Sequence, residues 1–261
     1  MPTYLSIVQS AKGYTVYPEI PLKVTLPAAA TALSIFAVVV LGNSTGGPFN
    51  TSYLDTTDPY ALFTVVPDPT VVDDETDTFT KRRNIINLYQ EISSSPVLTS
   101  PDASGYYLSA YVFTAPATAG AQVITVSDPG VSSTYSPPLA AGKPMFDGGI
   151  TAVVFEIAGS YLGSASQTTY DSGGSHSGYA DPLLATLTPG QTHNLLLEVG
   201  IMMDSSSITP AAGATLQHSG SFPAGSSFWT IQTTIQASAT AAAGFANPIE
   251  YTGGVIAVSF V

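Results

Sequence analysis

Charged residues are scarce in this chain of 261 residues, which contains six Lys or Arg and three His. They make up 9% of the sequence, against about 25% in an ordinary soluble domain. A surface this poor in charge favours association, so we expect contacts with further copies of the chain or with a partner. Catalysis needs groups that titrate, attack or bind metal, and their scarcity predicts a protein that is not an enzyme.

Cysteine is absent, which excludes disulfides, thiol catalysis and cysteine-ligated zinc. Acidic residues outnumber basic ones, 18 Asp or Glu against six Lys or Arg, and the net charge is −12. Nucleic-acid binding requires a basic surface, so we expect no nucleic-acid partner.

A secretory signal and a membrane span are not expected either. The N-terminus, Met1-Pro2-Thr3-Tyr4, lacks the basic region with which a leader begins. The longest strongly apolar run covers residues 33–41, about half of the length that a helix needs to cross hydrocarbon. Its β-branched residues predict a buried strand instead.

Turn-forming residues are abundant, with 23 Gly and 20 Pro, and they separate short apolar segments. This pattern predicts an all-β fold, an antiparallel β-sandwich or jelly roll with long loops and at most one or two short helices. The helical alternatives are residues 80–92 and 237–246. The expected strands cover residues 4–9, 14–17, 33–41, 60–66, 79–89, 106–113, 122–127, 149–157, 192–201, 213–220, 227–239 and 254–261.

Residues 229–237 alternate with a period of two, which predicts a half-buried strand with Thr and Gln on its polar face. The last strand, 254–261, is apolar and must be paired, because a bare apolar edge would aggregate. We expect a single domain over 1–261. The alternatives are an insertion or loop region at 67–101 and a boundary near 128–148.

The densest run of carboxylates comprises Asp73, Asp74, Glu75 and Asp77. Carboxylate oxygens are the ligands that calcium prefers, so a calcium site is one interpretation of this run. The spacing is not that of an EF-hand loop, and a solvated acidic loop is the alternative. No other cofactor is expected.

Two further groups are candidates for an interface or ligand site. Lys81, Arg82 and Arg83 follow the acidic run, which indicates either local charge pairing or a contact between subunits. Tyr161, Tyr170 and Tyr179 fall in one Gly/Ser-rich region, where exposed tyrosines could bind a partner or a sugar.

Catalytic patterns are incomplete. Residues 42–46 match G-x-S-x-G, but turn residues follow where a nucleophile elbow requires a helix. Glu156, Glu198 and Glu250 could supply paired carboxylates for glycoside cleavage only if the fold brings them together. The three histidines, His176, His193 and His218, are far apart in the sequence, so we expect no shared metal site.

Three segments follow one another in a familiar order: an aromatic strand at 106–113, the Ile124-Thr125-Val126 strand, and Ala152-Val153-Val154-Phe155-Glu156-Ile157-Ala158-Gly159. From residue 106 onward the chain resembles Ala/Ser/Thr-rich jelly-roll domains of bacteriophage virion proteins and bacterial surface proteins. The resemblance implies a structural role and carries over no catalytic residue.

Composition and resemblance together predict a non-enzymatic structural protein of a virion, such as a capsid decoration, tail or fibre component. Its partners would be further copies of itself and other virion proteins. The alternative is an extracellular or cell-surface adhesin, a lectin-like module that would bind host-surface glycan. One version of this alternative depends on calcium. A carbohydrate-active enzyme on a jelly roll is the third hypothesis.

Overall fold

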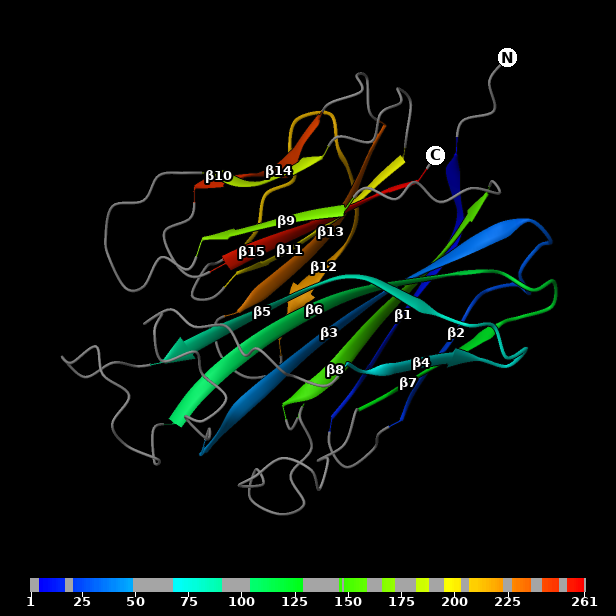
Figure 1. Cartoon of the computed structure of the whole chain (residues 1–261), viewed down its shortest axis with the longest axis horizontal. Helices are drawn as coiled ribbons and strands as arrows, with labels where there is room; N and C mark the ends of the chain where they lie inside the picture. Colours follow the sequence, from blue (N-terminus) through cyan, green and yellow to red (C-terminus); the bar gives the residue numbers. More distant parts are fainter. Residues whose placement is uncertain are drawn as a thin grey trace.

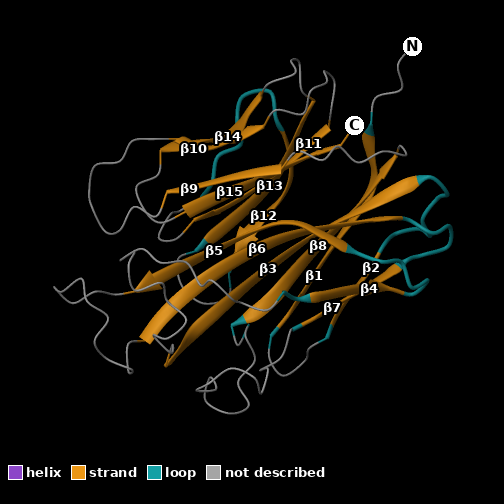
Figure 2. Ribbon diagram, in the orientation of Figure 1, coloured by secondary structure: helices purple, strands orange, loops and turns teal. Residues whose placement is uncertain are grey.

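The computed structural model, drawn in Figure 1, describes the following residues of the chain: 5–16, 21–48, 68–90, 104–128, 146, 148–158, 166–171, 182–187, 195–202, 207–222, 227–235, 241–248 and 253–260. Every regular element among them is a β-strand (Figure 2). The strands are β1 (Ser6–Thr15), β2 (Leu22–Thr25), β3 (Ser34–Pro48), β4 (Thr70–Asp73), β5 (Thr80–Gln90), β6 (Ser104–Pro116), β7 (Val123–Ser127), β8 (Gly149–Ala158), β9 (Ser166–Asp171), β10 (Pro182–Leu187), β11 (Leu195–Met202), β12 (Thr215–Ser221), β13 (Phe228–Ile235), β14 (Ala241–Pro248) and β15 (Gly253–Phe260).

All strand pairs are antiparallel, and they form two five-stranded sheets and two smaller ones. The central sheet has the order β1-β8-β3-β6-β5, and the second sheet has the order β12-β13-β11-β15-β9. The small sheet, β2-β7-β4, and the pair β10-β14 complete the fold. The predicted all-β antiparallel sandwich is confirmed, while jelly-roll connectivity stays a prediction.

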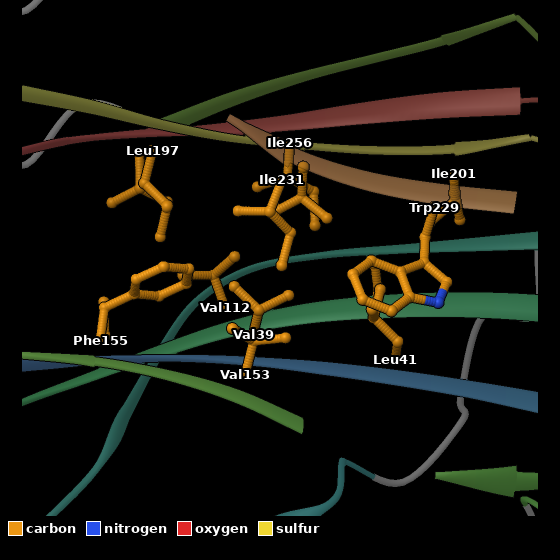
Figure 3. Packing of buried hydrophobic residues seen from close by; sticks show 14 of the residues in the cluster. Val39, Leu41, Val112, Val153, Phe155, Leu197, Ile201, Trp229, Ile231 and Ile256 are labelled. Atoms are coloured by element: carbon orange, nitrogen blue, oxygen red, sulfur yellow. The ribbon is translucent and has the colours of Figure 1, made fainter. Parts of the chain in front are cut away.

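The central sheet is buried on both faces, so its strands need no polar face. In β3, Val39 and Leu41 pack toward the second sheet, whereas Val38 and Val40 pack toward the small sheet. Figure 3 shows the contact between the two large sheets, where Val39, Val153 and Phe155 meet Leu197, Ile231 and Trp229. Burial on both sides explains why 33–41 is a continuous apolar run without alternation.

The second sheet is also covered on its outer face. A third cluster packs Leu196 and Val255 against Phe245 of β14 and against Ile208. The half-buried strand predicted for 229–237 is therefore wrong in one respect, because most of the polar face of β13 is shielded from solvent. Thr230 and Gln232 are buried, since residues 207–211 cross over them and supply hydrogen-bond partners.

Most predicted strands coincide with observed ones, but some boundaries differ. One strand, β1, covers parts of both predicted strands at 4–9 and 14–17, and residues 4 and 17 lie outside the described ranges. The helical alternatives at 80–92 and 237–246 are wrong: β5 and β14 occupy these segments and pair with β6 and β10. The expected strands do not include β2, β4, β9 and β10, and the strand predicted at 60–66 lies outside the described residues.

The terminal strand, β15, is paired on both sides, with β11 and β9, as its apolar sequence requires. β8 follows the boundary considered near 128–148 and pairs with β1 and β3, which precede it. The central sheet thus combines strands from both parts of the chain. Within the described part of the chain, no helix has the length and apolarity needed to span a bilayer.

Candidate functional site at the loop end of the sandwich

Three connections meet where β3 and β5 begin and β6 ends, and we call residues 26–33, 73–79 and 116–122 the loop end. Backbone hydrogen bonds join them: Ala30 N donates to Ala121 O at 2.8 Å, and Gly120 N donates to Ala30 O at 3.1 Å. Leu26 N donates to the carbonyl of Gln122 at 2.9 Å. Figure 2 shows these loops in teal beside β2 and β4. The bonds make the loop end one connected surface.

The acidic run lies in this surface, and its carboxylates accept hydrogen bonds from backbone amides. Asp73 Oδ1 accepts from Glu75 N at 3.1 Å and from Asp77 N at 2.8 Å. Asp74 Oδ1 accepts from Gln122 N at 3.0 Å, across to a neighbouring loop. The carboxylates therefore stabilise the turn and attach it to residues 116–122.

Asp77 makes the second attachment. Its Oδ2 accepts from Thr118 N at 2.7 Å, and its Oδ1 accepts from Thr118 Oγ1 at 2.5 Å. Burial opposes ionisation of this carboxyl, but these hydrogen bonds hold its pKa below the usual range. The Asp74 pKa is also lowered, because the amides of Gln122 and Val123 outweigh its desolvation.

Asp73 differs from its neighbours in its environment. It is only 7% exposed, and its Oδ2 is buried without a hydrogen-bond partner. Desolvation raises the pKa of this carboxyl, and the adjacent Asp77 carboxylate raises it further. No three metal-ligating side chains converge among the residues that the structure describes. Calcium binding by Asp73, Asp74, Glu75 and Asp77 stays a prediction.

Glu156 secures the loop end from within the central sheet. Its side chain is fully buried; Oε1 accepts from Thr31 N at 2.8 Å and from Thr31 Oγ1 at 2.7 Å. Oε2 accepts from Gln9 Nε2 at 2.6 Å, and the Gln9 amide in turn bonds both backbone groups of Ala28 at 2.9 Å. Burial would raise the Glu156 pKa, but these bonds and one from Ser34 lower it, so the carboxylate is ionised.

Backbone strain also concentrates at the loop end. Leu33, with φ 69°, and Thr76, with φ 66°, are the non-glycine residues with positive φ in the described ranges. Such a conformation costs a bulky or β-branched residue about 1–3 kcal/mol. Leu33 is also 77% exposed, so no burial of its side chain offsets that cost. In proteins, strained residues of this kind cluster at active sites, ligand clamps and switch segments.

The basic cluster lies on β5, close to the loop end. Lys81 Nζ forms an ion pair with Asp68 Oδ2 at 2.6 Å. This is local charge pairing, but with Asp68, which precedes the acidic run. Arg82 Nε donates to Thr114 Oγ1 at 2.6 Å, beside a register shift in the β5–β6 pair, and Arg83 is exposed. A role of these three residues between subunits stays a prediction.

The predicted tyrosine group falls largely outside the described residues. Tyr170 lies in β9 opposite Gly254 of β15. Tyr161 and Tyr179 lie outside the described ranges. Their joint role in an interface or ligand site stays a prediction.

The two described carboxylates considered for glycoside cleavage are not brought together. Glu156 faces the small sheet, whereas Glu198 lies on the outer face of the second sheet, where Oε2 accepts from Gln232 Nε2 at 2.6 Å. Packed sheets lie about 10 Å apart, and the paired carboxyls of glycosidases need about 5–9.5 Å. Since each group faces away from the other layer, their separation exceeds that range. Glu250 lies outside the described residues.

The other catalytic patterns are also dispersed. Residues 42–46 lie within β3, which continues to Pro48, so they do not form the strand-to-helix turn of a nucleophile elbow. His218 lies on β12, where its Nε2 is 3.1 Å from Ser10 Oγ of β1. His176 and His193 lie outside the described residues.

Sequence reasoning missed the residues that organise the loop end, Gln9, Thr31 and Thr118. Their carboxylate partners lie 147, 125 and 41 positions away, so no local spacing reveals the contacts. Comparisons with protein-family models, curated proteins and solved structures found no match.

Proposed function

We propose that this chain is a non-enzymatic structural subunit that functions as a homo-oligomer. The observation that carries the proposal is the use of its scarce carboxylates: Asp74, Asp77 and Glu156 each accept a hydrogen bond from a backbone amide of the loop end in another segment of the chain. Carboxylates bonded in this way stabilise the loops and are not free to transfer protons or bind substrate. A stiff stack of sheets with a surface poor in charge suits a subunit of a larger assembly.

The narrower proposal is a virion component, such as a capsid decoration, tail or fibre protein, assembled with itself and with other virion proteins. It rests on the resemblance of the segment from residue 106 onward to phage jelly-roll domains. Light scattering of the purified chain, followed by cryo-electron microscopy, tests the proposal. Ordered rings, filaments or a lattice are expected, and a monomer at high concentration would refute the assembly role.

A second candidate function is a glycan-binding module of an adhesin, and the strained loop end favours it. Leu33 and Thr76 hold unfavourable backbone conformations in the loop end, which also contains the buried Asp73 Oδ2 without a hydrogen-bond partner. If this surface binds glycan through calcium, the chain should bind a glycan array, and EDTA and Asp73→Asn should each abolish binding. Thr78→Ala, an exposed change beside the same turn that removes no carboxylate, is the control. Array binding unaffected by EDTA would exclude the calcium-dependent form.

A further inference from the structure

The edge of the central sheet at β1 is less protected than its opposite edge at β5 and than the edges of the small sheet at β2 and β4. β2 and β4 are four residues long, and β5 carries Lys81, Arg82 and Arg83. β1 is ten residues long, and its one charged residue is Lys12. Within the described strands β1 pairs with β8 alone, so no other described strand occupies its second edge from Ser6 to Tyr14.

The one charged side chain of β1, Lys12, does not protect this edge from pairing with another strand. Lys12 Nζ lies 5.5 Å from the centre of the Trp229 ring, so it interacts with the second sheet in a cation–π contact. A β-bulge at Val8, between the paired residues Ile7 and Gln9, interrupts the strand near its start. The segment from Gln9 to Tyr14 continues in regular register with β8.

Exposed apolar side chains flank that regular segment. Val8 is 50% exposed and Tyr14 is 49% exposed, although both are large. They are separated by six positions, with the small residues Ser10, Ala11 and Gly13 between them. Apolar groups at both ends of a small-residue segment form a self-complementary edge.

We propose that β1 is the strand through which two copies of this chain join, antiparallel to each other about a two-fold axis at Ala11. In this register Tyr14 of one copy lies opposite Val8 of the other, an aromatic–β-branched pair that stabilises antiparallel strands. Lys12 lies opposite Ser10, so the two lysines do not face each other. Isologous contacts of this kind are the commonest way in which identical chains associate.

This inference rests on the proposed homo-oligomeric function and names the surface that would carry it. Because the chain has no cysteine, introduced thiols report the register directly. The double variant Val8→Cys/Tyr14→Cys should form a disulfide-linked dimer on oxidation, since residues 8 and 14 of different copies are opposite. Neither single variant should cross-link comparably, because its thiols would lie far apart.

The second measurement is sedimentation velocity of Val8→Lys, with Val72→Lys as the control. Val72 is 44% exposed on β4, so the two changes are matched in chemistry and exposure. Val8→Lys should weaken association by about tenfold or more, and Val72→Lys should not.

The outcomes separate the two proposals. The β1 interface alone is overturned if the wild-type chain assembles, Val8→Lys assembles equally well and the double cysteine variant does not cross-link. A wild-type chain that is monomeric at high concentration overturns the homo-oligomeric function as well.

Discussion

Replacing Glu156 with Gln should destabilise the protein measurably, although the change is nearly isosteric. The new amide can still accept from Thr31 through its oxygen, but its NH₂ group replaces Oε2 and faces Gln9 Nε2 at the position of a 2.6 Å hydrogen bond. Rotating the Gln9 amide does not relieve this conflict, because both of its ends are bonded to Ala28. The variant therefore replaces one charge-assisted hydrogen bond with two opposed donors.

A hydrogen bond to a charged group contributes about 1.5–3 kcal/mol, so we expect Glu156→Gln to lower the free energy of unfolding by about 2 kcal/mol. For a chain of this size, that corresponds to a fall in melting temperature of about 4 °C. Urea unfolding followed by fluorescence measures the free energy, and calorimetry measures the temperature. Glu75→Gln, the same substitution at an exposed position, should change stability by less than about 0.5 kcal/mol.

The pH dependence provides a second check on the same carboxylate. The Glu156 pKa is lowered in the folded protein, so its stabilisation is present above the ordinary value of 4.5 and is lost as pH falls through the folded value. The difference between wild type and Glu156→Gln should therefore shrink on acidification below pH 4.5. An unchanged unfolding midpoint at neutral pH, or a difference that is constant down to low pH, would refute the assigned role of Glu156.

Three further changes test other parts of the fold. Gly200→Ala should cost about 1–3 kcal/mol in urea unfolding, because a Cβ there would lie 2.6 Å from Phe245 Cε2; a neutral result would mean that β14 does not pack on β11. Burial, and to a lesser extent the charge of Lys12, lower the His218 pKa, so the free energy of unfolding should fall as pH drops below 6.5. His218→Gln should flatten this pH dependence of stability, and a similar slope in both proteins would contradict the lowered pKa. Leu33→Asn should raise the melting temperature by about 2 °C, because Asn tolerates positive φ and the exposed Leu side chain loses no packing; a lower temperature would show that Leu33 is unstrained.

The strands and the class of fold follow largely from the sequence. Turn residues at short intervals and β-branched apolar segments determine where many strands begin and end, so β7, β8 and β15 match their expected ranges to within one residue. β3 instead continues to Pro48, past its expected end at residue 41. The local pattern could not distinguish strand from helix at β5 and β14, because their assignment depends on pairing with β6 and β10. Short strands such as β2 and β4 are invisible in the sequence, since four residues carry too little periodicity.

Burial of polar side chains was decided by the tertiary structure alone. The alternation in β13 indicates which residues share a face, but it cannot reveal that residues 207–211 cover Thr230 and Gln232. The role of Glu156 likewise depends on Thr31 and Gln9, more than a hundred positions away. The sequence by itself determined that this is a β protein with few charged residues and no cysteine. Only the packing of the layers decided which of its few carboxylates hold the loop end together, because those contacts join segments that the sequence separates.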